Sequence, residues 1–308
     1  MTSHTAKLTP KQAEALRGIL AKRDFESAEV PHAVFSYKRP KLAITWYKSG
    51  KLLIQGKGTQ EFVEFTLEPE VLGQAAFADA LDAQPEQLEP RLGVDESGKG
   101  DFFGPLVVAG VYVNEPVARA LDGLGVKDSK AIASDKKIAA LAKGIRDTPG
   151  CVYSVVPIGN ASYNRLHQKM RNVNKILAWG HARVIENLLG QRDRMNPEPL
   201  RAISDQFARS KATIQSALME EGRQLKLVQM HKAESDIAVA AASILARDLF
   251  VQRLSTLGRV FDLELPKGAS SKVDAAGAAF LKKHGMDKIG QAAKLHFRTT
   301  QKIQAGLL

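Results

Sequence analysis

The sequence GVDESGKGDFFGPLVVAGVYV, residues 93–113, places two adjacent acids beside a glycine-rich turn and a long apolar run. The acids are Asp95 and Glu96, and the apolar, largely β-branched run at 106–113 predicts a buried strand. Adjacent carboxylates at the end of a buried strand lose hydration and repel each other unless a positive charge joins them. Because hard ions such as Mg²⁺ take oxygen ligands, the stretch is a candidate metal site. The turn consists of Gly98, Lys99 and Gly100.

Two other interpretations of this stretch exist. Asp-Glu-Ser-Gly is ordinary turn sequence, so a surface hairpin without a site is one of them. Residues 93–99 also fit the G-x-x-x-x-G-K pattern of a phosphate-binding loop, but Gly100 stands where that pattern needs Ser or Thr. Two acids inside the loop would also repel the phosphates, which disfavours the phosphate-binding interpretation.

The charge balance favours an anionic partner such as nucleic acid. The 308 residues carry 44 Lys and Arg against 33 Asp and Glu, which gives a formal charge of +11 and a pI near 9.6. Residues 1–85 are nearly neutral, with 11 basic and 10 acidic residues, so most of the surplus lies beyond them. A local run of cations without an intervening acid comprises Lys38, Arg39, Lys41, Lys48, Lys51 and Lys57.

Cysteine content and hydropathy indicate the compartment. The single cysteine, Cys151, excludes an intramolecular disulfide, and its place at the start of an apolar run predicts a buried residue and not a nucleophile. The first twelve residues are polar, unlike a secretory signal. No apolar run approaches the roughly 20 residues that cross a bilayer. We therefore expect a cytoplasmic protein with no membrane contact.

Length and pattern predict two domains joined by a linker at 86–91. Residues 1–85 are expected to form a small α+β unit that starts with a helix over 9–22, capped by Thr9. Strands are then predicted at 32–37, 42–47 and 51–58, followed by a partly helical stretch at 59–83. Residues 92–308 alternate strands with helices, which is typical of a mixed α/β layer.

Within the second domain, further strands are predicted at 151–158, 200–207 and 225–230. Helices are predicted from Ser134 or Asp135, over 160–190 as one or two segments, and from Ser235 to about Leu257. The last of these is rich in alanine, which would let it lie close to a sheet. The region 267–302 is expected to be helical and basic.

Acidic residues recur where predicted strands end or helices begin. Asp95 and Glu96 end the first strand, Asp205 lies near the end of a later one, and Glu234 stands at a strand-to-helix junction. Each has a structural explanation alone: Asp205 suits a turn, and Glu234 suits a helix N-terminus. If the strands are neighbours, however, four carboxylates meet at one rim of the sheet.

The order of several motifs resembles the type 2 ribonucleases H, specifically the bacterial ribonucleases HIII. The resemblance rests on DESGKGDFFGPLVVAGVYV (95–113), KDSK (127–130), NKILAWGHA (174–182), AESDIAVAAASILARD (233–248), LPKGAS (265–270) and AKLHFRTT (293–300). It implies a ribonuclease H-like fold. The segment KLAITWYKSGKLLIQGKG (41–58) resembles the amino-terminal TATA-binding-protein-like domain of that group, which implies substrate binding by residues 1–85.

The resemblance implies an endonuclease that cuts the RNA strand of RNA–DNA hybrids with two Mg²⁺ or Mn²⁺ ions, leaving 3′-hydroxyl and 5′-phosphate ends. It implies Asp95, Glu96 and Asp205 as metal ligands, with Glu234 as the fourth and Asp236 as the fallback. Two such ions suit phosphodiester hydrolysis because they activate a water and balance the charge on the leaving oxygen. We expect a monomer without a protein partner.

The resemblance also assigns substrate contacts. The turn of Gly98, Lys99 and Gly100 matches a segment that recognises the ribose 2′-hydroxyl through backbone groups. A segment beside the substrate backbone is matched by Lys127, Ser129 and Lys130. No tyrosine follows Tyr163, whereas ribonucleases HII use a C-terminal tyrosine at junction ribonucleotides, so we expect better cleavage of ribonucleotide runs than of a single ribonucleotide. A metal nuclease that cuts DNA and a non-catalytic nucleic-acid binder are the alternatives.

Overall fold

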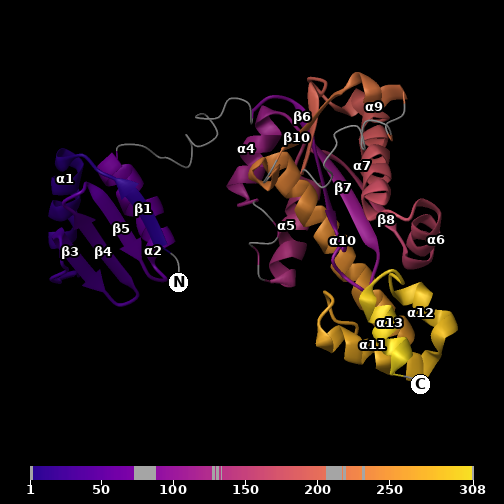
Figure 1. Ribbon diagram of the computed structural model, residues 1–308. Coiled ribbons are helices and arrows are strands. Elements are labelled where there is room, and N and C mark those ends of the chain that lie inside the picture. Colours follow the sequence, from indigo (N-terminus) through magenta and orange to yellow (C-terminus); the bar gives the residue numbers. More distant parts are fainter. Residues whose placement is uncertain are drawn as a thin grey trace. The chain divides into compact units, whose positions relative to one another are not determined.

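The computed structural model describes residues 3–72, 88–126, 129, 132, 134–205, 217, 220–230 and 233–306. By its internal contacts the chain divides into two compact units, Met1–Pro85 and Glu86–Leu308. Each unit has its own sheet (Figure 1). Each also has its own apolar core.

The first unit is an antiparallel sheet with the order β1-β5-β4-β3-β2. Its strands are β1 (Ser3–Lys7), β2 (Glu26–Ser27), β3 (Ala33–Arg39), β4 (Leu42–Tyr47) and β5 (Lys51–Gln55). Its helices are α1 (Pro10–Ala21), α2 (Thr59–Phe62) and the π-helix η1 (Val63–Leu72). The helix and the three strands predicted from the sequence are confirmed, whereas β1 and the short β2 were not predicted.

Local sequence explains how α1 begins. The Thr9 hydroxyl accepts from the backbone N–H of Gln12, and the Gln12 side chain accepts from the Thr9 N–H, so the two form a reciprocal cap. The apolar face of α1, including Leu16 and Leu20, packs with Ile44 of β4 and the inward residues of β5 in one core. The opposite face of the sheet carries Thr45, whose hydroxyl lies 2.8 Å from that of Ser36.

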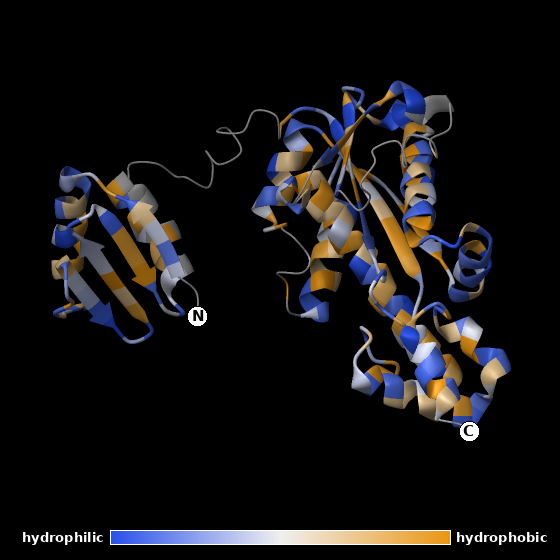
Figure 2. Cartoon of the chain, viewed as in Figure 1, coloured by the Kyte–Doolittle hydropathy of each residue, from blue (hydrophilic) through white to orange (hydrophobic). Residues whose placement is uncertain are grey.

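The second unit contains a five-stranded mixed sheet with the order β10-β9-β6-β7-β8. Its strands are β6 (Arg91–Ser97), β7 (Leu106–Val113), β8 (Val152–Ile158), β9 (Arg201–Asp205) and β10 (Lys226–Met230). The first three are antiparallel neighbours, and β9 and β10 run parallel to β6. The predicted strands of this mixed α/β unit are confirmed over the residues that the structure describes, and residues 206 and 207 of the predicted strand 200–207 lie outside them. Every residue of β7 is buried, and its ribbon is largely coloured hydrophobic in Figure 2.

Helices cover both faces of this sheet (Figure 1). The described helices before α10 are α4 (Glu115–Gly123), α5 (Asp135–Asp147), α6 (Asn160–Met170), α7 (Val173–Leu189), η4 (Arg192–Arg194), α9 (Glu220–Gln224) and η5 (Ala233–Ser235). The rest are α10 (Ile237–Phe261), α11 (Ser271–His284), α12 (Met286–Ala292) and α13 (Arg298–Ala305). The N-cap of α5 is Ser134, as predicted, whereas α10 is slightly longer than predicted.

Small residues set the spacing between the helices and the sheet. A Cβ on Gly93 would lie 2.2 Å from the carbonyl carbon of Ala238, so α10 can pack on β6 only because that position is glycine. On the other face, a Cβ on Gly110 would lie 2.4 Å from a methyl group of Val184 on α7. The alanine-rich start of α10 is buried against the sheet, which confirms the role predicted for its small residues.

Candidate active site

Strand register brings two of the predicted carboxylates to neighbouring positions. The parallel pairing of β6 with β9 matches Val94 with Ser204, so Asp95 and Asp205 follow directly at the same end of the two strands. Side chains two residues apart on a strand share a face. Asp95 therefore shares the face of Gly93, which packs on α10, and Asp205 shares the face of Ile203. Both carboxylates are half-buried.

Glu234 lies on this same face. It belongs to the 3₁₀ turn η5, whose Ala233 packs with Ile203 of β9 and Val239 of α10 in one small buried cluster. Those contacts place the turn against the face of β9 that carries Asp205. The Glu234 side chain is half-buried, as are the other predicted ligands.

The fallback ligand Asp236 has a structural position. Its Oδ2 accepts from Nε of Arg91 over 2.7 Å, and its Oδ1 accepts from the backbone N–H of Ala238 over 2.9 Å, which caps α10. Arg91 and Asp236 are both buried. One carboxylate oxygen of Asp236 thus holds the start of α10 to β6, and the other caps the helix.

Glu96 leaves β6 towards the opposite face. It shares the face of Val94, which packs with residues of α7, and its Oε2 lies 3.0 Å from Nε2 of the buried His181 on that helix. Its Oε1 lies 3.7 Å from the ammonium of Lys99. Only 11 % of the Glu96 side chain is exposed.

The Gly-Lys-Gly turn follows β6. Gly98 has a φ of +91°, and a Cβ there would lie 2.2 Å from the carbonyl oxygen of Pro105, so only glycine fits. Lys99 and Gly100 are exposed, and a Cβ on Gly100 would meet nothing within 4 Å. Packing within the described residues therefore does not require a glycine at position 100.

The remaining predicted contact residues are less fully placed. Ser129 is buried, and its hydroxyl lies 2.7 Å from that of Ser243 on α10, so the side chain faces the helix and not the surface. Lys127 and Lys130 lie outside the described residues. Cys151 is buried, as predicted, and burial raises the pKa of its thiol to about 12, which disfavours the thiolate.

The four candidate ligands at the ends of β6 and β9 have the oxygen donors that hard cations prefer, although their side chains are not gathered around one point. Across the described ranges, no three Asp, Glu, His or Cys side chains are grouped closely enough to hold a metal ion. The four candidate ligands nevertheless offer half-buried carboxylate oxygens at one end of β6 and β9. Oxygen ligands of this kind suit Mg²⁺ and Mn²⁺.

A basic surface on α6 and α7 was not predicted from the sequence. Its exposed cations are Arg165, Lys169, Arg171, Lys175 and Arg183. The signal that could have found it is the absence of any Asp or Glu between Asp147 and Glu186. Arg183 lies over the ring of Trp179, at 5.9 Å from the ring centroid, so an aromatic side chain accompanies the cations.

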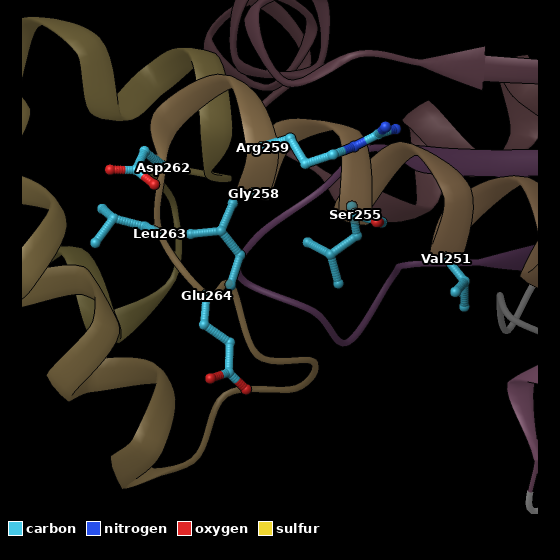
Figure 3. A pocket seen from close by; sticks show the side chains of 9 residues that line it. Val251, Ser255, Gly258, Arg259, Asp262, Leu263 and Glu264 are labelled. Carbon is cyan, nitrogen blue, oxygen red and sulfur yellow. The ribbon is translucent and has the colours of Figure 1, made fainter.

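A pocket elsewhere in this unit does not contribute to the rim. It has a volume of about 540 Å³ and lies between the last turns of α10 and residues 262–265 (Figure 3). It is lined in part by Val251, Arg259 and Glu264. The rim carboxylate Glu234 precedes the first turn of α10, so the pocket adjoins the other end of that helix.

None of the helices in the described part of the chain has the length and apolar character needed to span a membrane.

Comparison with known proteins gives the family. Residues 92–300 match the family model of ribonuclease HII, and residues 3–73 match a domain of unknown function (DUF3378). Ribonuclease HIII of Chlamydia pneumoniae is 43% identical over 303 residues, which is 97% of each chain. A crystal structure of Bst-RNase HIII in complex with Mn²⁺ is 33% identical, covers 99% of this chain and 98% of its own, and superposes with a TM-score of 0.67.

A more distant structure agrees with that match. The crystal structure of Aquifex aeolicus RNase H3 is 26% identical, covers 95% of this chain and 99% of its own, and has a TM-score of 0.54. Both structures and the curated relative span this chain almost end to end, including the first unit. The antiparallel sheet of that unit fits the TATA-binding-protein-like domain expected from the sequence. The chain therefore belongs to the ribonuclease HII family of type 2 ribonucleases H, within its ribonuclease HIII group.

Proposed function

We propose that this protein is an endoribonuclease that hydrolyses the RNA strand of RNA–DNA hybrids at the rim of the second sheet. The observation that carries the proposal is the adjacency of Asp95 and Asp205 at the ends of parallel strands, on the face that also carries Glu234. Half-buried carboxylates at the same end of neighbouring strands are stabilised in their charged form by a nearby cation. The Mn²⁺ complex of the related Bst enzyme supports a divalent ion as that partner.

Four residues would hold the ions. Asp95 and Asp205 would bind from the sheet, Glu234 from the turn before α10, and Glu96 from the side of α7. Two ions of Mg²⁺ or Mn²⁺ bound there would supply an activated water and balance the charge on the leaving 3′ oxygen, which yields 3′-hydroxyl and 5′-phosphate ends. His181 would fix the orientation of the Glu96 carboxylate through its 3.0 Å contact, as residues next to metal ligands commonly do.

The Gly98–Gly100 turn would recognise the RNA strand. Its exposed residues, Lys99 and Gly100, closely follow the carboxylates on β6, and the 2′-hydroxyl is the group that distinguishes RNA from DNA at a given position. The basic surface on α6 and α7 would contact phosphates of the duplex, because its five exposed cations lie in a segment without acids. We expect weaker cleavage at a single embedded ribonucleotide, since no tyrosine follows Tyr163.

The first unit would add a second binding surface for the hybrid. The face of its sheet away from the core carries Lys7 and Lys51, which are paired in the register of β1 with β5, and Lys38 on β3. In the described part of the first unit, the helices pack their core residues against the other face of the sheet. A broad face with small polar residues and peripheral lysines suits a phosphate backbone. We further propose that the protein acts in the cytoplasm as a monomer.

A cleavage assay tests the proposal. The protein is incubated with Mg²⁺ or Mn²⁺ and one of three substrates. These are an RNA–DNA hybrid with an end-labelled RNA strand, the matching DNA duplex and the matching RNA duplex. We expect cleavage of the RNA strand of the hybrid, with 3′-hydroxyl and 5′-phosphate ends, and none of the DNA duplex. The matched control is Asp95→Asn, which should be inactive. Cleavage of DNA, or unchanged cleavage by Asp95→Asn, would refute the proposal.

A further inference from the structure

A buried lysine joins the C-terminal helices to the loop that follows the Gly-Lys-Gly turn. Lys294 lies between α12 and α13 and has no exposed surface. Its ammonium Nζ donates to the backbone carbonyl of Asp101 over 2.8 Å and to that of Gly104 over 2.6 Å. Its backbone N–H donates to the carbonyl of Phe102 over 2.8 Å. Lys294 thus contacts three of the four residues of loop 101–104.

Packing alone does not explain a lysine at this position. Burial of an ammonium is costly, and an apolar side chain of similar length would fill the space without that cost. Desolvation lowers the pKa of Lys294 to about 7, against the opposing attraction of Asp101. Tyr163 is the aromatic neighbour, with its ring centroid 5.8 Å from the ammonium. What the lysine provides, and an apolar residue would not, is donors for the two loop carbonyls.

Other contacts fix the same loop at both ends. The Asn160 amide donates to the carbonyl of Gly104 over 2.7 Å. The carboxylate of Asp101 accepts from the backbone N–H of Gly268 over 2.6 Å, and the N–H of Gly104 donates to the carbonyl of Ala292 over 2.9 Å. Loop 101–104 is therefore bound by α6 and by two segments of the C-terminal region.

The loop is continuous with the turn at Gly98–Gly100. The backbone N–H of Asp101 donates to the carbonyl of Gly98 over 3.4 Å, which closes the turn on the fixed loop. Lys99 and Gly100 are the exposed residues between these anchors. A shift of Asp101 would therefore move the backbone that stands exposed beside the carboxylates.

We propose that Lys294 is a positioning residue for recognition of the RNA strand: its ammonium fixes loop 101–104 and, through Asp101, the backbone of the Gly98–Gly100 turn. The proposal rests on the proposed function, since it assigns the turn to the ribose of the substrate. Lys294 itself has no exposed surface, so it would act through the loop. Its removal should affect sugar discrimination more than stability.

The test compares Lys294→Met with the parent on a set of hybrids. The RNA strand carries one 2′-deoxynucleotide, moved stepwise through the positions on either side of the cleaved bond, and kcat/KM is measured for each. In the parent, we expect one or two positions at which the missing 2′-hydroxyl lowers kcat/KM. In Lys294→Met that penalty should shrink, and kcat/KM on the all-RNA strand should fall roughly 10- to 100-fold, as misplacement of a recognition element costs.

Two further variants separate positioning from stability. Val273→Ala shortens a buried side chain of α11 that belongs to the same core as Phe102, and valine has no side-chain donor for the loop carbonyls. It should lower the thermal midpoint and leave the 2′-deoxy penalty as in the parent. Lys294→Gln keeps side-chain amide donors, so its 2′-deoxy penalty should lie between those of Lys294→Met and the parent. This variant also replaces Lys294→Met in the test if Lys294→Met does not fold.

The outcomes are distinguishable. The positioning role is overturned if both Lys294 variants show the same 2′-deoxy penalty in kcat/KM as the parent, and if their losses of kcat/KM follow thermal stability as in Val273→Ala. The proposed function would remain intact in that case. A parent protein that does not cleave the hybrid would instead refute the proposed function. A reduced penalty in Lys294→Met, together with an unchanged thermal shift by Mn²⁺, supports the positioning role, because the metal site is then unaltered.

Discussion

Arg91 at the start of β6 and Asp236 at the cap of α10 form a buried ion pair, with Nε and Oδ2 2.7 Å apart. The two residues are 145 positions apart in the sequence. The pair fixes the first turn of α10 against the strand that carries Asp95 and Glu96. Glu234 lies two residues before Asp236, in a 3₁₀ turn, so the same pair also fixes the position of that turn.

This ion pair predicts that substitution of Asp236 affects stability, whereas substitution of Glu234 affects activity. Asp236→Asn leaves the Arg91 charge buried beside a neutral amide and should lower the free energy of unfolding by about 3 kcal/mol. Glu234→Gln should leave that free energy nearly unchanged and abolish cleavage of the hybrid. Urea unfolding followed by circular dichroism and the cleavage assay measure the two effects. If Asp236→Asn is stable but inactive, Asp236 is the fourth ligand and Glu234 is not.

Much of the fold could be predicted because local sequence specifies it. The Thr9 and Ser134 caps, the hairpin of β6 and β7, and the alanine-rich face of α10 follow from turn, capping and periodicity rules. Strand β1 was not predicted because SHTAK has no apolar alternation; its pairing with β5 stabilises it. Propensity is a weak guide where a partner strand supplies the hydrogen bonds.

The candidate site was predictable in its residue types and less so in its geometry. The four acids could be chosen from the sequence, and the strand register places Asp95 beside Asp205. Alternation along a strand sends Glu96 to the other face, towards His181, although it is adjacent to Asp95 in sequence. The structural role of Asp236 depends on Arg91, and the burial of Lys294 depends on a loop almost 200 residues earlier. Contacts at such sequence separation leave no local signal.

Divalent ions should stabilise the second unit. Ions that bind the rim carboxylates of the folded protein and not the unfolded chain raise its stability by mass action, by about 2.7 kcal/mol at 100 times the dissociation constant. We expect Mg²⁺ or Mn²⁺ to raise the thermal midpoint of the parent and much less that of Asp95→Asn. Differential scanning fluorimetry with a matched Na⁺ series measures this, and equal shifts in both proteins would argue against binding at Asp95.

His181 should tune the metal site through Glu96. His181→Ala removes the partner 3.0 Å from the Glu96 carboxylate, and we expect a loss of roughly 10- to 100-fold in metal affinity or activity. His181→Gln keeps a donor and should recover part of that loss. The control is Asn187→Ala, which changes an exposed residue of the same helix. Isothermal titration with Mn²⁺ measures the affinity; unchanged binding by His181→Ala would show that the contact does not orient Glu96.

Removal of residues 1–85 should weaken binding without slowing the chemical step. The second unit has its own buried cores, so it should fold alone, but it loses one of two binding surfaces. Because linked modules raise each other's effective concentration, we expect the Kd for hybrid to rise roughly 100-fold while kcat at saturation stays similar. Binding of both proteins should fall steeply with salt. A truncated protein with parental Kd would exclude a binding role for the first unit.

Stability should depend on pH through Lys294. Desolvation lowers its pKa in the folded protein to about 7 from the usual 10.5, so between these values the unfolded chain binds more protons than the folded one. The free energy of unfolding should therefore rise as the pH rises from about 7 towards 10.5, on the order of a few kcal/mol. The neighbouring groups are Asp101, Tyr163 and His296. Burial raises the pKa of Tyr163 to about 12, and desolvation lowers the pKa of His296 to about 4, so both side chains keep their charge state over most of this pH range.

Urea unfolding of the parent and of Lys294→Met at several pH values isolates the effect of the lysine, because other groups contribute equally to both proteins. The difference between the two proteins should change steadily with pH, and parallel curves would show that Lys294 titrates as it does in the unfolded chain.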